Sequence, residues 1–377
     1  MIYLDNNAST PVDPEVSDAV FSSLRREFGN PSSAHAVGRR AYEFLEACRK
    51  TVAECLGCSA DEIIFTSGGT ESNNLAILGT ARHHGKGHII TSAIEHPSVL
   101  QVCRHLEKSG FAVTYISTGR DGIIDLEQLQ DAITKETVLI SVMHANNETG
   151  VIQPVEEIGR IARRHGIAFH CDAAQTIGKI SFAHADAGID LLTVAAHKFY
   201  GPKGVGALAV RKGLPISPLL FGAGHERGLR PGTENLPGIS GLAKACQIGA
   251  RDIRLRVSHT THMKNLLFTR LSTALPDIRL NGHSTQRLPN TLNILIPGIL
   301  SYELVERLKG VVALSSGSAC HAGSHSPSTV LRQMGLSDEE ALSSVRISAG
   351  KDNTLEEIEK AVSLIIEAVR ELRETSS

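Results

Sequence analysis

Lys198 is the residue of this sequence with the clearest chemical potential. It follows the apolar run 189–194, which predicts a buried strand, and the turn formed by residues 201–204 comes next. A lysine shielded from water at the end of such a strand loses its proton readily, and its amine can then form a Schiff base with a carbonyl group. An ordinary loop lysine would have the same local sequence, so this stretch alone leaves both interpretations open.

Residues 66–72, Thr-Ser-Gly-Gly-Thr-Glu-Ser, predict a site for an anion at the start of a helix. Gly68 and Gly69 let the backbone approach a ligand closely, the free amides of the helix favour negative charge, and Thr70 adds a hydroxyl. The pattern lacks the third glycine of the dinucleotide fingerprint and the Gly-Lys-Ser/Thr ending of a P-loop. We interpret it as a phosphate-binding turn, with a simple helix cap as the alternative.

Polar side chains also follow three other expected strands. These are His96 after residues 88–92, Asn147 after 138–142, and Asp172 and Gln175 after 167–171. Strands that alternate with helical segments such as 154–165 favour a mainly parallel sheet, which binds ligands outside the carboxyl ends of its strands. We therefore expect one crevice lined by Thr70, His96, Asn147, Asp172, Gln175 and Lys198.

The expected crevice suits pyridoxal phosphate, which a lysine holds covalently. The carboxylate of Asp172 would keep a pyridine nitrogen protonated and so make the ring an electron sink. Gln175 could bond the ring hydroxyl, and His96 could stack on the ring or move a proton. Asp172 as a helix N-cap is the structural alternative.

Two residues of the last third of the chain complete the set. Cys320 lies in residues 313–327, which are rich in Gly, Ser and Ala and supply little apolar contact, so we expect an exposed, mobile and reactive thiol. Arg346 lies in an expected strand at 344–348, and its guanidinium suits a substrate carboxylate.

With these residues assembled, the chain resembles the cysteine desulfurases of the NifS/IscS type, which are fold-type-I pyridoxal phosphate enzymes of the class V aminotransferase family. The resemblance covers nearly the whole chain. The matching segments are residues 4–8, 66–72, 95–96, 146–148, 172–175, 197–198, 230–233 and 316–320.

The resemblance implies an α/β architecture with a mainly parallel central sheet flanked by helices in a large domain, and a smaller α/β domain that carries the cysteine loop. It implies conversion of L-cysteine to L-alanine, with the sulfur passed to an enzyme cysteine as a persulfide. The sulfur would serve iron–sulfur cluster or thio-cofactor synthesis through an acceptor protein such as an iron–sulfur scaffold. The implied catalytic residues are Lys198 as the Schiff-base lysine, His96 stacked on the ring, and Cys320 as the sulfur acceptor.

The resemblance also implies the binding residues. Asp172 and Gln175 would contact the ring nitrogen and hydroxyl. The phosphate would be held by Gly69, Thr70, His197 and, across a homodimer interface, Thr233. The substrate would be held by Asn7, Asn147 and Arg346.

Two departures from the desulfurase pattern leave alternatives open. Ala195 stands where desulfurases usually carry a phosphate-binding Ser, and His321 stands where Thr or Ser is common. The Cys320-His321 pair, with residues 286–291 and 199–200, is similar to selenocysteine lyases, so L-selenocysteine is an alternative substrate. An aminotransferase is a further alternative on the same fold. A non-enzymatic metal scaffold or sensor would use Cys320, His321 and His325, but that spacing suits no closed zinc site, and we predict no bound metal.

The whole chain sets the context for these residues. Its 377 residues predict two domains, one of residues 13–250 and one of residues 1–12 with 251–377, divided within a helical stretch at 237–275. A charged content of 21% and a net charge of −2 give no reason to expect nucleic acid or a membrane as a partner. The seven cysteines are scattered, and no leader or long apolar run appears, so we expect reduced thiols and a cytoplasmic location.

Overall fold

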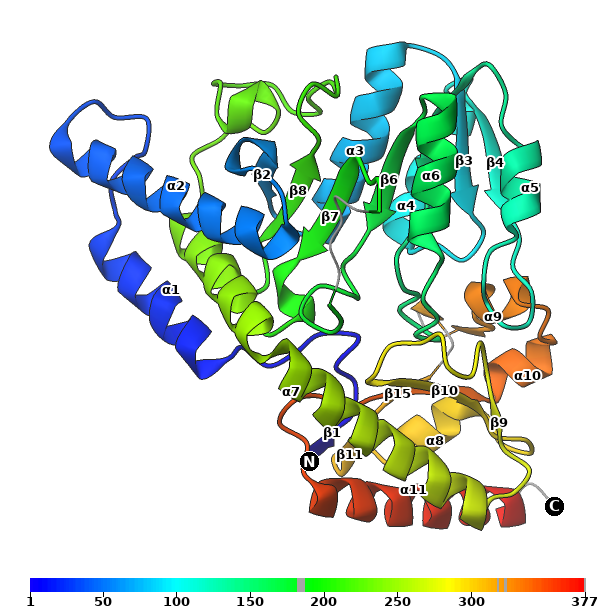
Figure 1. The fold of residues 1–377 in the computed structure, drawn as a ribbon. Helices are drawn as coiled ribbons and strands as arrows, with labels where there is room; N and C mark the ends of the chain where they lie inside the picture. The colour runs from blue at the N-terminus through cyan, green and yellow to red at the C-terminus, as the bar shows by residue number, and fades with distance from the viewer. Residues whose placement is uncertain (182–186, 317–318, 322–323, 376–377) are drawn as a thin grey trace.

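The structure, a computed structural model, describes residues 1–181, 187–316, 319–321 and 324–375 and contains two main sheets (Figure 1). The larger sheet has seven strands in the order β2-β8-β7-β6-β5-β3-β4. Its neighbouring strands are parallel except that β8 runs antiparallel to both β2 and β7, so the predicted, mainly parallel sheet is confirmed. Their bounds, in that order, are Ile63–Thr66, Gly206–Val210, Leu191–Ala195, Ala168–Asp172, Thr137–Ser141, His88–Ser92 and Ala112–Ile116.

Helices cover both faces of this sheet, because successive strand residues point to opposite sides and both sides are apolar. In β3, the fully buried Ile89 packs in the core with α3 and α4, whereas the fully buried Ile90 packs in the core with α2, α6 and α7. The helices of this part are α1 (Pro14–Arg26), α2 (Ala36–Leu56), α3 (Gly69–His84), α4 (Pro97–Lys108), α5 (Leu126–Asp131) and α6 (Val155–His165).

The second sheet is antiparallel, with its four strands in the order β12-β15-β10-β9. Its bounds, in that order, are Ser315–Ser316, Ser344–Ser348, Thr291–Leu295 and Arg279–Leu280. Two smaller pairs accompany it, β1 (Ile2–Tyr3) with β11 (Val312–Ala313) and β13 (Ala319–His321) with β14 (Ser324–Ser326). The remaining helices are α8 (Ser301–Arg307), α9 (Thr329–Gln333), α10 (Asp338–Leu342) and α11 (Leu355–Thr375).

The long helix α7 (Leu236–Ala274) runs from one part to the other (Figure 1). Its first half contributes Leu242 and Ile248 to the core of the large sheet, and its second half contributes Met263 and Leu271 to the core of the small sheet. The predicted helix at 237–275 is therefore present, while a domain boundary near residue 250 stays a prediction. Within the described chain, no helix combines the length and the apolar character needed to cross a membrane.

Candidate active site

One cavity of about 190 Å³ lies where the carboxyl ends of β2, β3, β5, β6 and β7 meet. The structure brings all six residues of the expected crevice to its wall. The lining includes Thr70, His96, Asn147, Asp172, Gln175 and Lys198, together with Gly69, Asn73, Ala195 and His197. Strand direction thus gathers side chains that are far apart in the sequence.

One end of the cavity is the turn between β2 and α3, which is built to receive an anion. Gly68 has a φ of 149°, a value that favours glycine, and α3 begins at the next residue. Strand β8 packs directly against this turn, because a Cβ on Gly206 would lie only 2.7 Å from the Gly68 Cα atom. The first amides of α3 have no carbonyl partners within the helix, so they and the Thr70 hydroxyl can bind phosphate oxygens.

Lys198 ends the short 3-10 turn Ala196–Lys198 that follows β7. Its Nζ donates hydrogen bonds to the backbone oxygens of Asn7 (2.8 Å) and Ala8 (2.9 Å). Burial, reinforced by the positive charge of Arg346, lowers the pKa of this amine to about 8. Burial and the neighbouring Lys198 also lower the pKa of His197 to about 4, so its ring is neutral at pH 7.

A hydrogen-bonded chain connects Asp172 to His96. Asn73 Nδ2 donates to Asp172 Oδ2 (2.7 Å) and to the Ser98 hydroxyl oxygen (2.8 Å), and that hydroxyl lies 2.8 Å from His96 Nδ1. The Ser98 backbone N–H also donates to His96 Nδ1 (3.1 Å). Because Nδ1 accepts these bonds, the neutral ring carries its proton on Nε2. Burial lowers the pKa of His96, which favours this neutral form. Asn73 was not anticipated from the sequence.

Asn7 and Arg346 lie behind the cavity wall rather than among its lining residues. Asn7 is fully buried, and its side chain bonds Lys179, Asn290, Thr291 and the Asn147 backbone; its substrate contact stays a prediction. Arg346 donates to the Asn147 backbone oxygen (3.1 Å) and to Asp5 (2.8 Å). Its buried Nε has no hydrogen-bond partner, which leaves one donor for a ligand.

The predicted residues Thr233 and Cys320 cannot be placed on this cavity. Thr233 is exposed and is not among the lining residues, and its role across a dimer interface stays a prediction. The side chain of Cys320 lies outside the described part of the structure. The segment that carries it is attached near the cavity at both ends, because Ser315 pairs with Arg346 and the Ser328 hydroxyl donates to Glu148, the neighbour of Asn147.

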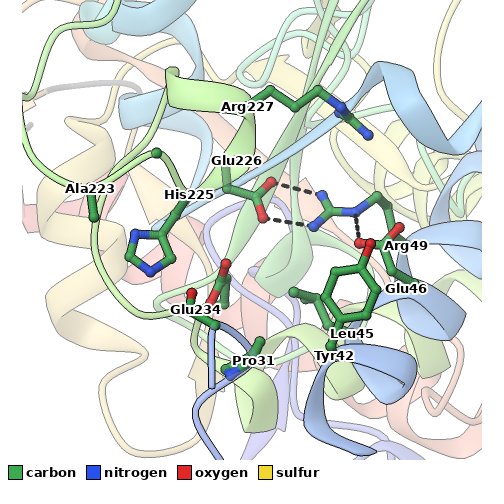
Figure 2. Close-up of a pocket in the computed structure, with 12 residues that line it drawn as sticks. Pro31, Tyr42, Leu45, Glu46, Arg49, Ala223, His225, Glu226, Arg227 and Glu234 are labelled. Carbon is green, nitrogen blue, oxygen red and sulfur yellow. Dashed lines mark hydrogen bonds and ion pairs between the residues drawn. The ribbon is translucent and has the colours of Figure 1, made fainter. Parts of the chain in front are cut away.

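A second cavity, of about 440 Å³, lies between α2 and residues 223–234 (Figure 2). The central charges are paired there, since Arg49 donates to both carboxylate oxygens of Glu226, at 2.7 and 2.8 Å. Glu226 and Arg227 have positive φ angles of 44° and 57°, a conformation that costs energy outside glycine and that the ion pair helps to hold. The ion pair between Arg49 and Glu226 therefore anchors the loop that leads to Thr233.

The groups that line the cavity around Lys198 fit pyridoxal phosphate. A low-pKa amine, a buried carboxylate and a helix N-terminus border one cavity, and the Asn73 Oδ1 atom in its wall is buried without a hydrogen-bond partner. Lys198 would hold the cofactor, Asp172 would face its ring nitrogen, and the start of α3 would bind its phosphate. No cluster of three potential metal ligands occurs among the residues described.

Comparison with known proteins agrees with this geometry. The family described as aminotransferase class-V matches residues 2–361. A protein of Anaeromyxobacter sp. (strain Fw109-5) named cysteine desulfurase IscS is 44% identical over 380 residues, which cover 100% of this chain and 94% of that protein. A solved structure named NifS-like protein superposes with a TM-score of 0.92 at 38% identity, over 98% of this chain and 99% of the other. The structure named SspA in complex with cysteine gives 0.82 at 37% identity, over 94% and 100%. This chain therefore belongs to the class V aminotransferase family of fold-type-I enzymes.

Proposed function

We propose that this chain is a cysteine desulfurase, which converts L-cysteine to L-alanine and transfers the sulfur to its own Cys320 as a persulfide. The observation that carries the proposal is the cavity that joins Lys198, Asp172 and the start of α3 in a chain with full-length similarity to proteins named cysteine desulfurase. The test is product analysis with L-cysteine. Equal amounts of alanine and sulfide, released in the presence of a thiol reductant, are expected, whereas a keto acid without sulfide would indicate an aminotransferase instead.

The enzyme depends on pyridoxal phosphate, which supplies an electron sink for negative charge at the α carbon of the substrate. Asp172 would keep the ring nitrogen protonated, and the Asn73 amide holds its carboxylate in place. The neutral His96 ring presents its Nε2–H to the cavity. Lys198 would hold the cofactor covalently, and its amine, with a pKa lowered to about 8, is suited to move the α proton.

The lowered pKa of Lys198 predicts how the cofactor-free protein captures pyridoxal phosphate. Only the neutral amine is a nucleophile, so the capture rate should rise with pH. It should reach half of its maximum near pH 8, where half of the amine is deprotonated, and level off at higher pH. The rate is measured from the growth of cofactor absorbance at a series of pH values. A free lysine side chain would show the rise near its ordinary pKa of about 10.4. A rate that still climbs steeply through pH 10 would contradict this environment.

Ala195 gives a second prediction, because it lines the cavity beside the start of α3. Its Cβ lies only 3.4 Å from the place where a Cβ on Gly69 would be. In Ala195→Ser the added hydroxyl should donate to the phosphate, and a hydrogen bond to a charged group is worth about 1.5 kcal/mol, or about tenfold in affinity. Equilibrium dialysis of pyridoxal phosphate measures the effect. Ala195→Val is the control, since it adds bulk without a donor and should not tighten binding; unchanged affinity in the Ser variant would place the phosphate elsewhere.

The substrate side of the cavity involves Asn147, Arg346 and Cys320. Asn147 lines the cavity, and Arg346, which lies behind it and donates to its backbone oxygen, would offer its unpaired Nε to the substrate carboxylate. The thiolate of Cys320 attacks the substrate sulfur, so a sulfur–sulfur bond forms as the carbon–sulfur bond breaks. None of the six cysteines whose side chains are described lines the cavity, which supports Cys320 as the acceptor.

A homodimer and an outside sulfur acceptor complete the proposal. Large apolar side chains are exposed on α1, on the segment that follows it, and on the loop before Thr233. They are Phe21, Leu24, Phe28 and Phe221. A second copy that covers them would bring its Thr233 to the phosphate. The persulfide would then pass to an acceptor such as an iron–sulfur scaffold protein, and a cytoplasmic location stays a prediction.

A further inference from the structure

Lys179 is a buried lysine close to the active cavity that the proposed mechanism does not use. It lies behind the cavity wall, eight per cent exposed, on the turn that follows β6. Its Nζ donates to Gln175 Oε1 (2.6 Å) and to Asn7 Oδ1 (2.9 Å). No ion pair between Lys179 and a carboxylate occurs within the described residues, so two neutral amide oxygens hold the amine. Such an arrangement is costly to bury and needs a reason beyond stability.

The bond from Lys179 determines which way the Gln175 carboxamide points. Lys179 Nζ donates to the Gln175 carbonyl oxygen, which fixes that oxygen on the side of the lysine. The Gln175 nitrogen is thereby placed on the other side, where one N–H donates to the Asn7 backbone oxygen (3.0 Å). The second N–H remains for a group in the cavity that Gln175 lines. Without Lys179, only the bond from the Gln175 nitrogen to the Asn7 backbone oxygen would hold the carboxamide in this orientation.

The same amine also orients Asn7, which contacts Lys198. Asn7 Oδ1 accepts from Lys179, so Asn7 Nδ2 faces the other way and donates to Thr291 Oγ1 (2.9 Å) and to the Asn147 backbone oxygen (3.2 Å). The Asn7 backbone oxygen accepts from both Gln175 and Lys198. One buried amine therefore organises the groups around the covalent lysine.

We propose that Lys179 is a positioning residue that holds Gln175 so that an N–H faces the ring hydroxyl oxygen of the cofactor in its deprotonated form. The proposal takes the cofactor from the proposed function. A donor at this oxygen stabilises its negative charge. It therefore favours the deprotonated form over the form in which a proton is shared between this oxygen and the nitrogen of Lys198. Lys179 therefore lowers the pKa of the lysine-bound cofactor, and any positive charge that it carries acts in the same direction. Burial and the nearby Lys198 and Arg346 lower the pKa of Lys179 itself well below its usual value.

The test is a pH titration of the cofactor absorbance in the complete holoenzyme. Lys179→Met keeps the apolar stem and removes the donor, and we expect the pKa of the absorbance change to rise by about one unit, the effect of one lost hydrogen bond. Gln175→Leu should raise it at least as much, and adding Lys179→Met to Gln175→Leu should add little, because the two residues act through one contact. Lys309→Met, at an exposed lysine paired with Glu306, controls for the loss of one charge and should leave the pKa unchanged.

A second variant keeps the test decisive if Lys179→Met does not fold. Lys179→Gln retains an N–H donor for Gln175 Oε1 without a charge, so its pKa should lie between those of the unaltered protein and Gln175→Leu. A titration identical to that of the unaltered protein, in whichever of the two Lys179 variants folds, would overturn the proposal. It would also be overturned if the pKa changes of Lys179→Met and Gln175→Leu added fully in the double variant. Turnover of L-cysteine by the unaltered protein tests the proposed function separately, because the titration requires only bound cofactor.

Discussion

Lys198→Ala should abolish turnover of L-cysteine, with a loss of about 10⁴-fold or more, and should remove the absorbance band of lysine-bound cofactor. Two functions disappear together, because the same amine holds the cofactor covalently and moves the α proton. The replacement should leave the fold intact. Among the described residues, Lys198 Nζ donates hydrogen bonds to the backbone oxygens of residues 7 and 8 and forms no ion pair, so its removal breaks few contacts. Absorbance spectra, product assays and thermal melting of the purified variant check these three statements.

Lys212→Ala is the matched control for Lys198→Ala. Lys212 is an exposed lysine whose side chain pairs with Asp61, and neither residue lines the cavity. It should keep both the absorbance band and the activity. Substantial turnover in Lys198→Ala would show that another group holds the cofactor, and the assignment of this cavity would fail.

Cys320→Ala should stop alanine release from L-cysteine while leaving cofactor and substrate binding intact. The two parts of the reaction use different groups. Lys198, Asp172 and the cofactor serve the acid–base and electron-sink steps, whereas the Cys320 thiolate removes the sulfur. We expect alanine release to fall at least about a thousandfold, which corresponds to ~4 kcal/mol of activation free energy. Spectral changes on addition of L-cysteine should persist, and they separate binding from turnover.

Cys58→Ala is the control for a lost thiol, because Cys58 is a free cysteine that does not border the active cavity. L-Selenocysteine distinguishes the alternative substrate. Selenium leaves carbon more readily than sulfur and can depart without a thiol acceptor. If Cys320→Ala released alanine from L-selenocysteine but not from L-cysteine, the enzyme would be assigned as a selenocysteine lyase. If alanine release from L-cysteine survived, the nucleophilic role of Cys320 would be wrong.

The elements that position the site were largely predictable from the sequence, because burial on both faces gives strands a continuous apolar run. β3 and β15 have the predicted bounds, His88–Ser92 and Ser344–Ser348. The turn and helix after β2 were visible from paired glycines, and α7 from its long helical pattern. The apolar pattern does not reveal strand direction. Gly206–Val210 is apolar throughout, as a parallel strand would be, but it runs antiparallel to both of its neighbours, β2 and β7.

The groups that line the cavity were also predictable, because they follow strands, whereas the groups behind them were not. Asn73 and Lys179 act on Asp172 and Gln175 through single contacts inside the fold. The only sequence signal for Lys179 is its spacing of four residues from Gln175, which is common in any turn or helix. Arg49 and Glu226 are 177 positions apart, and no local pattern pairs them. Residue roles at the cavity stay predictions until the variants are measured.

The most direct test of the account is the fate of the sulfur atom in a single turnover. The purified holoenzyme is mixed with a limiting amount of L-cysteine in the absence of reductant. It is then digested, and the masses of its peptides are measured by mass spectrometry. The account predicts one additional sulfur atom on the peptide that contains Cys320, in an amount equal to the alanine formed, and none on the peptides that contain Cys55 and Cys58. Alanine formed without any sulfur on Cys320, or an added sulfur on another cysteine, would contradict it.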